Sequence, residues 1–213
     1  MTRLSVYGAS LAVFIAASAL TLTSILVPHW VSMDVESQNS DTVYSQHLGL
    51  HHYCNTALPD KPCRTFPDEE KDCDPNDRYF CSMWRTTGFL MSFATVAELA
   101  TLVCFVVAIG GGSVKREYGW KVLCGLLSVV SVVQFAAMGL IVSFLLLSQG
   151  SVTFDPDYFT IGKALGWRLD TSWILCTVSA SVAAILVGAL ASCAYFLPPE
   201  DDGYNFLDDP IDV

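Results

Sequence analysis

The sequence predicts an all-α membrane protein in which four transmembrane helices form a bundle. Three observations carry this prediction. Of the 213 residues, 53% are hydrophobic and 15% are charged, whereas soluble domains have about 25% charged residues. The apolar residues are concentrated in four long runs, and a helix of about 20 apolar residues crosses a bilayer. Half of the eight cysteines lie in one polar interval between the first two runs, which is typical of a disulfide-stapled loop outside the cytosol.

The first run, residues 4–27, contains no charged residue and is followed by Pro28. Arg3, the apolar stretch and the small residues 17–19 together imitate a secretory signal peptide with its cleavage site. The apolar run continues well past Ala19, however, and this favours a retained helix. Both interpretations place the following interval outside the cytosol.

The other three runs predict three further helices. Residues 86–109 are apolar apart from Glu98, residues 122–147 contain Gln134 but no charge, and residues 172–197 are uncharged and end before two prolines. Proline cannot continue a helix because it lacks the backbone N–H donor. We therefore expect a single membrane domain that ends with the fourth helix, at residue 197.

Basic residues in short loops predict the orientation, because Lys and Arg are enriched on the cytosolic side. The interval between the second and third helices carries three of them, and a fourth precedes the first helix: Lys115, Arg116, Lys121 and Arg3. With four helices these regions share one side, so both termini are expected in the cytosol. Loops 28–85 and 148–171 then face outward at the plasma membrane, or into the lumen of an internal secretory-pathway membrane.

The cysteines of the first loop are expected to form disulfides. Cys54, Cys63, Cys73 and Cys81 form an even set in an oxidising compartment. Four cysteines allow three pairings, of which Cys54–Cys63 with Cys73–Cys81 is the simplest. A zinc site is the competing interpretation, but the loop contains no CxxC. The remaining four cysteines lie in apolar runs and are expected to act as small apolar residues.

The same loop carries a pattern that resembles the extracellular signature of the claudin superfamily. That superfamily includes the peripheral myelin and epithelial membrane proteins and the transmembrane regulators of glutamate receptors. The residues that match its order and spacing are Trp30, Gly49, Leu50, Cys54, Cys63 and Arg85, the last directly before the predicted second helix. His51 stands where the family has a second Trp, and Cys73 and Cys81 are additional. These departures indicate a distant branch, and fungal tetraspan proteins of the eisosome or pH-sensing type are the nearest alternative.

The resemblance implies a small extracellular antiparallel β-sheet, formed by the two outward loops, on top of the helices. The Cys54–Cys63 bridge would tie neighbouring strands, and Trp30 would anchor the sheet at the membrane surface, a position that also suits an indole in general. In claudins, charges of the first loop set the ion selectivity of a paracellular pore. Here residues 28–84 carry ten acidic and four basic side chains, which would favour cations if such a pore formed.

Two polar residues inside the predicted spans attract attention. An ionised Glu98 at mid-membrane is costly, so such a residue normally faces a partner or a cavity. Gln134 lies at a similar depth and is a candidate hydrogen-bond partner. A protonated or hydrogen-bonded glutamate that fixes packing is the favoured interpretation, and proton coupling or ligand binding is the alternative.

Rows of small residues at four-residue spacing are expected to let the helices pack closely. They occur in the first and fourth runs: Gly8, Ala12 and Ala16, and Ala180, Ala184, Gly188 and Ser192. Packing within the chain is the favoured interpretation of these rows. Docking of one row onto a partner subunit is the alternative.

Histidines and acidic residues of the first loop suggest metal sites but do not predict one. His47, His51 and His52 cluster in sequence, with His29 beside Trp30, and imidazoles are ligands for zinc or copper. Their spacing does not place them on one face, so an ordinary interfacial cluster that can respond to pH is favoured. The acidic run 68–77 lacks the Gly and the closing Glu of an EF-hand. We therefore expect no metal and no cofactor.

Residues 198–213 are too acidic to fold alone and are expected to form a disordered cytosolic tail. Tyr204 to Leu207 fits a tyrosine-based sorting pattern, and Ile211 to Val213 fits a C-terminal carboxylate held in a PDZ groove. Both patterns arise often by chance. Adaptors of these two types are thus candidate partners.

The sequence favours a non-enzymatic protein. The net charge of −10 disfavours nucleic acid as a partner. A thiol oxidoreductase would need a reactive CxxC pair, and a hydrolase would need a base, whereas the predicted helices contain no His. Two functions remain: an organiser of membrane or cell-surface assemblies that contacts itself, or an auxiliary subunit of a larger polytopic channel, transporter or synthase.

Overall fold

The computed structural model describes residues 3–36, 43–56, 63–68, 72–73, 78–148, 163–164 and 167–196. In chain order, its elements are α1 (Arg3–Leu26), β1 (Val31–Glu36), β2 (Val43–Leu48), β3 (His52–Asn55), β4 (Cys63–Thr65), α2 (Arg78–Gly110), α3 (Gly112–Ser148), β5 (Lys163–Ala164), β6 (Arg168–Leu169) and α4 (Thr171–Phe196). The tail and its two motifs, at Tyr204 to Leu207 and Ile211 to Val213, lie outside the described residues.

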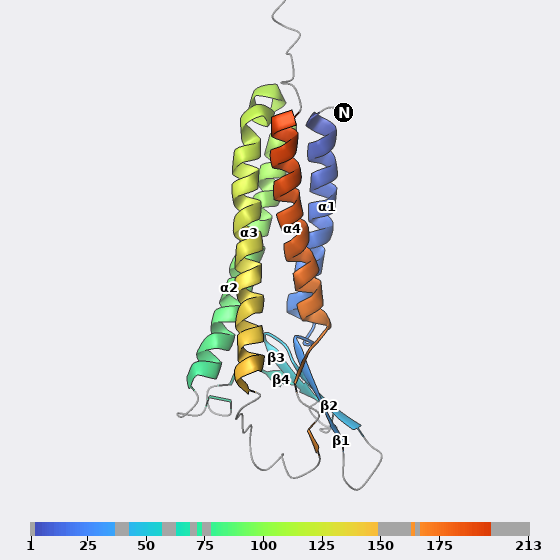
Figure 1. The fold of residues 1–213 in the computed structure, drawn as a ribbon, viewed down its shortest axis with the longest axis vertical. Coiled ribbons are helices and arrows are strands. Elements are labelled where there is room, and N and C mark those ends of the chain that lie inside the picture. The colour runs from blue at the N-terminus through green and yellow to red at the C-terminus, as the bar shows by residue number, and fades with distance from the viewer. Residues whose placement is uncertain are drawn as a thin grey trace, which may run out of the picture.

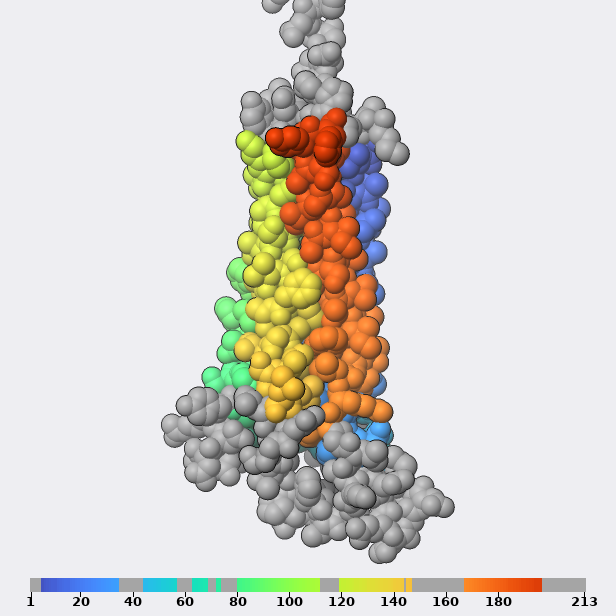
Figure 2. All heavy atoms as spheres, viewed as in Figure 1, coloured from blue at the N-terminus to red at the C-terminus, as the bar shows by residue number. Residues whose placement is uncertain are grey.

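The four helices form an up-and-down bundle with the sheet at one end (Figure 1). Each helix packs chiefly against two neighbours, in the cyclic order α1, α2, α3, α4. The space-filling view shows α3 and α4 side by side along the bundle (Figure 2). The N-terminus, the α2–α3 connection and the end of α4 lie at the end opposite the sheet. The predicted four-helix bundle is confirmed.

Two helices begin earlier than hydropathy predicts. α2 starts at Arg78 rather than residue 86, and α3 starts at Gly112 rather than residue 122, so that only Gly111 separates them. Hydropathy finds the stretch that suits hydrocarbon, but the backbone hydrogen bonds of a helix continue into its polar flanks. In the added turns of α2, Phe80 and Trp84 are buried beneath the sheet, which stabilises the helix outside the apolar run.

The outer surface of the bundle is apolar. All four helices are long and apolar enough to cross a membrane. Large apolar side chains face outward on each of them, including Ile15, Leu22, Phe89, Val96, Val106, Val122, Val132, Ile174 and Ile185, all more than 45% exposed. A water-soluble protein of this size does not expose so large an apolar surface. The surface is therefore a lipid-facing one.

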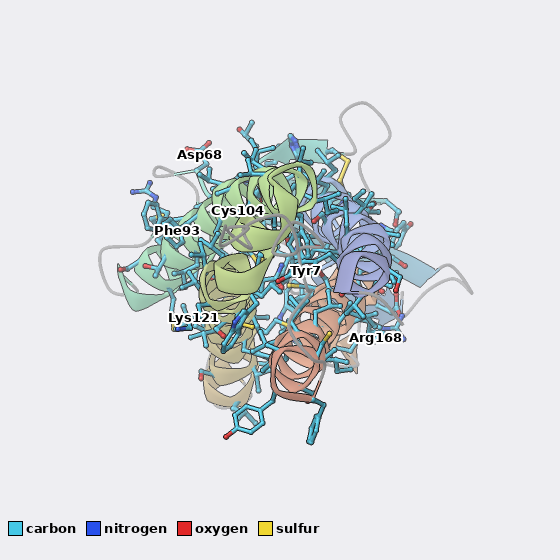
Figure 3. All side chains as sticks on the ribbon, turned by 90° about the horizontal axis from the view of Figure 1, so that it is seen from above. Tyr7, Asp68, Phe93, Cys104, Lys121 and Arg168 are labelled. Carbon is cyan, nitrogen blue, oxygen red and sulfur yellow. A yellow bond between two sulfur atoms is a disulfide. The ribbon has the colours of Figure 1, made fainter. Side chains whose placement is uncertain are left out.

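The interior contains two apolar clusters, one at each end. The cluster beside the sheet includes Trp30, Leu50, Trp84, Met91, Ile141 and Cys176. The cluster at the other end includes Tyr7, Phe14, Phe105, Leu127 and Leu186. Figure 3 looks along the bundle and shows Tyr7 directed between the helices, with Arg168 at the periphery. The two clusters leave a polar layer between them at mid-bundle.

The sheet contains strands from both loops. Its order is β4-β3-β2-β1-β5, and β6 pairs with the same edge of β1 as β5. All described pairings are antiparallel, with Val31 opposite Leu48 between β1 and β2, and Ser32 opposite Arg168 between β1 and β6. The small antiparallel sheet that the resemblance implied is thus confirmed, with β1 as the strand that joins the two loops.

Candidate functional site

The sheet end of the bundle is the first part of the candidate site, and a close backbone approach holds it in place. Gly49 donates its N–H to the carbonyl of His52 at 2.8 Å. A Cβ atom at Gly49 would lie 2.5 Å from Cα of Pro28, closer than atoms can approach. Glycine is therefore required where the strand β2 turns past the end of α1. The neighbouring Leu50 is 2% exposed and inserts into the apolar cluster below.

Two tryptophans attach the sheet to the helices. Trp30 donates its indole N–H to the carbonyl of Ser24 at 2.7 Å, and Trp84 donates to the carbonyl of Gly49 at 3.2 Å. Both rings are buried, and Trp30 has no exposed surface at all. Trp30 thus attaches the sheet through a ring enclosed by the protein, and its position at the membrane surface stays a prediction. Its apolar ring is enclosed between sheet and helices, and its polar N–H is satisfied by the last turn of α1.

Both disulfides occur in the described loop. Cys54 and Cys63 face each other across β3 and β4, and Cys73 is joined to Cys81 in α2. Disulfides in the first loop were predicted, and the observed pairing is the simplest of the three considered. The first bridge holds a strand pair together, and the second ties the loop to α2.

An aromatic cluster fills the space between the disulfides and α2. Phe66 lies 5.5 Å from Trp84, edge to face, and 5.9 Å from Phe80, measured between ring centroids. Arg64 lies over the ring of Tyr53, 4.9 Å from its centroid, where the ring quadrupole attracts a cation. These contacts join strands β3 and β4 and the residue after β4 to the first turns of α2.

Asp72 also belongs to this part of the fold, where Arg64 binds its carboxylate. Its carboxylate accepts a bidentate pair of hydrogen bonds from Arg64 and a third from the N–H of Asp68. The side chain of Asp72 is 3% exposed. Both of its oxygens are thus used within the protein.

Three titratable residues meet where the sheet joins the bundle. His29 follows α1, His47 lies on β2, and Asp170 immediately precedes α4. The two imidazole rings are 4.3 Å apart between centroids, and Nδ1 of His47 is 3.6 Å from Oδ2 of Asp170. In contrast, His51 and His52 are exposed. Of the three first-loop histidines that lie close in sequence, only His47 belongs to this group. Its partners, His29 and Asp170, come from other segments of the chain.

The environment sets the charge states at this junction. Burial, and next the repulsion of His29, hold the pKa of His47 below its usual value, although the Asp170 carboxylate acts in the opposite direction. Burial opposes ionisation of Asp170, but hydrogen bonds from the backbone N–H and hydroxyl of Thr171 outweigh it and lower the pKa of that carboxyl. Asp170 is therefore an anion beside neutral imidazole at neutral pH.

The second part of the candidate site is the polar layer at mid-bundle, to which each helix contributes one side chain. Thr21 of α1 lies 2.8 Å from Oε1 of Glu98 in α2 and 2.7 Å from Oγ of Ser179 in α4. Gln134 of α3 donates through Nε2 to Thr21 at 2.9 Å and to Glu98 at 2.8 Å. Glu98 is 2% exposed and Gln134 has no exposed surface. The suspected contact between Glu98 and Gln134 is present.

Two interpretations of the helix sequences need correction. Arg85 does not precede α2 but lies inside it, because the helix begins at Arg78. The small-residue rows face outward: Gly8, Ala12, Ala16, Ala184, Gly188 and Ser192 are exposed, and only Ala180 is buried. Packing within the chain is therefore the wrong interpretation for these rows. Four-residue spacing defines a face of a helix but does not say whether that face is inside.

Sequence reasoning missed Thr21, Ser179 and Asp170. Hydroxyls in transmembrane helices commonly bond to the carbonyl four residues before them, as that of Thr23 does to Ala19 at 2.8 Å, so Thr21 looked ordinary. Asp170 lay in the other loop from the histidines. Only the pairing of β6 with β1 brings it beside His47.

These features define an integral membrane protein with four spans and a disulfide-containing antiparallel sheet between the first two. No protein-family model matches the chain, and no curated protein matches it.

Proposed function

We propose that this protein is a non-enzymatic, claudin-like tetraspan that organises membrane or cell-surface assemblies through its outward loops and lateral helix contacts. One observation carries the proposal: both loops contribute strands to a single sheet that two disulfides and two buried tryptophans hold rigidly on the bundle. A rigid surface loses little conformational entropy on association, which favours its use as a docking surface. The matched positions Trp30, Gly49 and Leu50 serve this attachment, and Cys54 and Cys63 join two strands of the sheet.

The outward rows of small residues support lateral contacts. In lipid, helices associate through close packing of small residues, since hydrocarbon removes most of the hydrophobic driving force. Gly8 and Gly188 have no neighbouring atoms within 4 Å of an added Cβ, so their faces are open for a second helix. Such a helix can belong to another copy or to a larger polytopic protein, and the latter defines the alternative function of an auxiliary subunit.

Purification in gentle detergent with estimated stoichiometry separates the two functions. An organiser is expected as a homo-oligomer without a second major protein. An auxiliary subunit is expected to copurify with one polytopic partner at a fixed ratio. Recovery of a monomer without a partner, both in gentle detergent and in native-lipid nanodiscs, would contradict both functions.

A matched pair of variants tests the lateral contact itself. Gly188→Leu places a bulky side chain on the open face of α4 and is expected to abolish oligomer formation or partner binding. Ile185→Leu, at an exposed apolar position of the same helix, is expected to leave that association intact. Equal retention in both variants would show that this face of α4 is not used.

The proposed orientation places both termini in the cytosol and the sheet outside, at the plasma membrane. The basic residues between the second and third spans support it, as does the position of both disulfides on the opposite end, because disulfides persist in oxidising compartments. Sorting or PDZ-type adaptors at the tail belong to the same proposal.

A further inference from the structure

We propose that His29, His47 and Asp170 form a binding site for a divalent transition-metal ion with the ligand preference of Zn²⁺, at the junction of sheet and bundle. Each residue offers one ligand atom, and the three atoms lie within 4.8 Å of one another. Two imidazoles and one carboxylate form a donor set that zinc accepts readily, with a fourth position left for water or a further ligand. This inference goes beyond the organising role and does not depend on it.

The distances suit a small tetrahedral ion. Bonds of about 2.0–2.1 Å in tetrahedral geometry place neighbouring ligand atoms about 3.3 Å apart. Nδ1 of His47 and Oδ2 of Asp170 are 3.6 Å apart, too far for a good hydrogen bond but close to one edge of such a tetrahedron. The three ligand atoms lie within 4.8 Å of one another, so the third ligand must move inward before one ion can bind all three.

An unsatisfied buried nitrogen atom also points to a metal ion. Within the described part of the chain, Nδ1 of His47 is buried and has no hydrogen-bond partner, which is a costly state for a polar atom unless a ligand satisfies it.

The surrounding charges do not repel a cation. The guanidinium of Arg168, in the neighbouring strand β6, is paired with Asp34 at 2.8 Å, so its charge is already balanced. Asp170 supplies the negative charge of the site. Its other oxygen is held by the N–H of Thr171 at 2.7 Å, which orients the carboxylate in the way that second-shell contacts orient metal ligands.

A bound ion would tie together three segments that are distant in sequence: the end of α1, strand β2 and the start of α4. Ser172 already bonds to this region through its N–H to the carbonyl of His29 at 2.9 Å. The metal would thus fix the second loop against the first and stabilise the whole sheet.

The experiment uses full-length protein from which any polyhistidine tag has been removed, because such a tag binds zinc. After chelation and exchange into clean detergent buffer, equilibrium dialysis against Zn²⁺ is expected to give saturable binding of one ion per chain. The double variant His29→Gln/His47→Gln is expected to lose that ion, and Asp170→Asn, which preserves the helix cap, to weaken binding at least tenfold. The control His51→Gln/His52→Gln alters the exposed histidines and is expected to bind as the native protein does.

Binding that is absent in the native protein, or that survives in His29→Gln/His47→Gln, would overturn the proposal. Loss of binding in the control pair would also overturn it. If the double variant fails to fold, Co²⁺ titration of the native protein decides. An intense visible spectrum of tetrahedral cobalt that Zn²⁺ displaces, but millimolar Mg²⁺ does not, supports the site, and a six-coordinate aqueous spectrum contradicts it.

Discussion

At the scale of single residues, Thr21 is the centre of the polar layer, since its hydroxyl contacts the polar side chains of three other helices. Thr21→Val keeps the shape but removes all of these hydrogen bonds. We expect a loss of about 1–2 kcal/mol in the free energy of unfolding, because the buried polar partners of Thr21 are left without a hydrogen bond. A single hydrogen bond between membrane helices contributes less than this on average, but Thr21 has several. Unfolding in mixed micelles measures it. Thr23→Val, on an exposed turn of the same helix, is the control and should change stability by less than about 0.5 kcal/mol.

The number of hydrogen-bond donors in the polar layer predicts the protonation state of Glu98. Five contacts of 2.9 Å or less join Glu98, Thr21, Gln134, Ser179 and the carbonyl of Ala17, besides a longer one of 3.4 Å from the Thr21 hydroxyl to the same carbonyl. With an ionised Glu98, the two hydroxyls and the amide supply four protons for these five contacts. A neutral Glu98 supplies the fifth: it donates to Thr21, Thr21 donates to Ser179, and Ser179 donates to the carbonyl. The neutral form also avoids the cost of a buried charge in the membrane.

Infrared spectroscopy at neutral pH tests this state. Exposed carboxyls are ionised there, so a protonated Glu98 should give a carboxylic-acid C=O band that disappears in Glu98→Gln. The variant should fold with stability within about 1 kcal/mol of the native protein, since an amide replaces the neutral acid without adding charge. No difference between the two proteins in the carboxylic-acid C=O region would show that Glu98 is ionised.

Gly49 provides the sharpest steric test at the residue scale. Gly49→Ala forces a methyl group onto the backbone of Pro28, and overpacking of this kind costs about 1–3 kcal/mol. We expect a lower thermal midpoint and poorer recovery of folded protein. Gly188→Ala adds the same methyl group in open space on α4 and should be neutral or slightly stabilising. A Gly49→Ala protein as stable as native would mean that the chain relaxes away from α1.

At the scale of elements, the Cys54–Cys63 bridge holds the β3–β4 pair, which consists of short strands at the sheet edge. Cys54→Ser/Cys63→Ser removes a cross-link with a sequence separation of 9, for which chain entropy gives a loss of about 2–3 kcal/mol. Thermal unfolding of the oxidised protein and of this variant measures the difference. The helices should remain folded, because their contacts lie below the sheet. Helical circular dichroism that is lost together with the sheet would contradict that independence.

Elements also differ in how far the sequence predicts them. Hydropathy located the four spans because lipid requires long apolar runs, but it could not find the polar turns at Arg78 and Gly112. In the first turns of α2, the packing of Phe80 and Trp84, and not transfer to lipid, supports the helix. The disulfides followed from cysteine number and compartment. The polar layer and the histidine–aspartate junction could not be predicted fully, because each combines residues from elements whose rotation and pairing are decided by tertiary packing.

At the scale of the whole molecule, the sheet and the N-terminus lie at opposite ends of the bundle, so one labelling experiment determines the orientation. Arg168→Cys places a thiol in the second loop beside the sheet, and Lys121→Cys places one on an exposed position of α3 near the other end. An impermeant maleimide is expected to label Arg168→Cys in intact cells and Lys121→Cys only after permeabilisation. The native protein, whose free cysteines lie in the helices, gives the background. The reverse pattern would invert the proposed topology, and labelling of both only after permeabilisation would place the protein in an internal membrane.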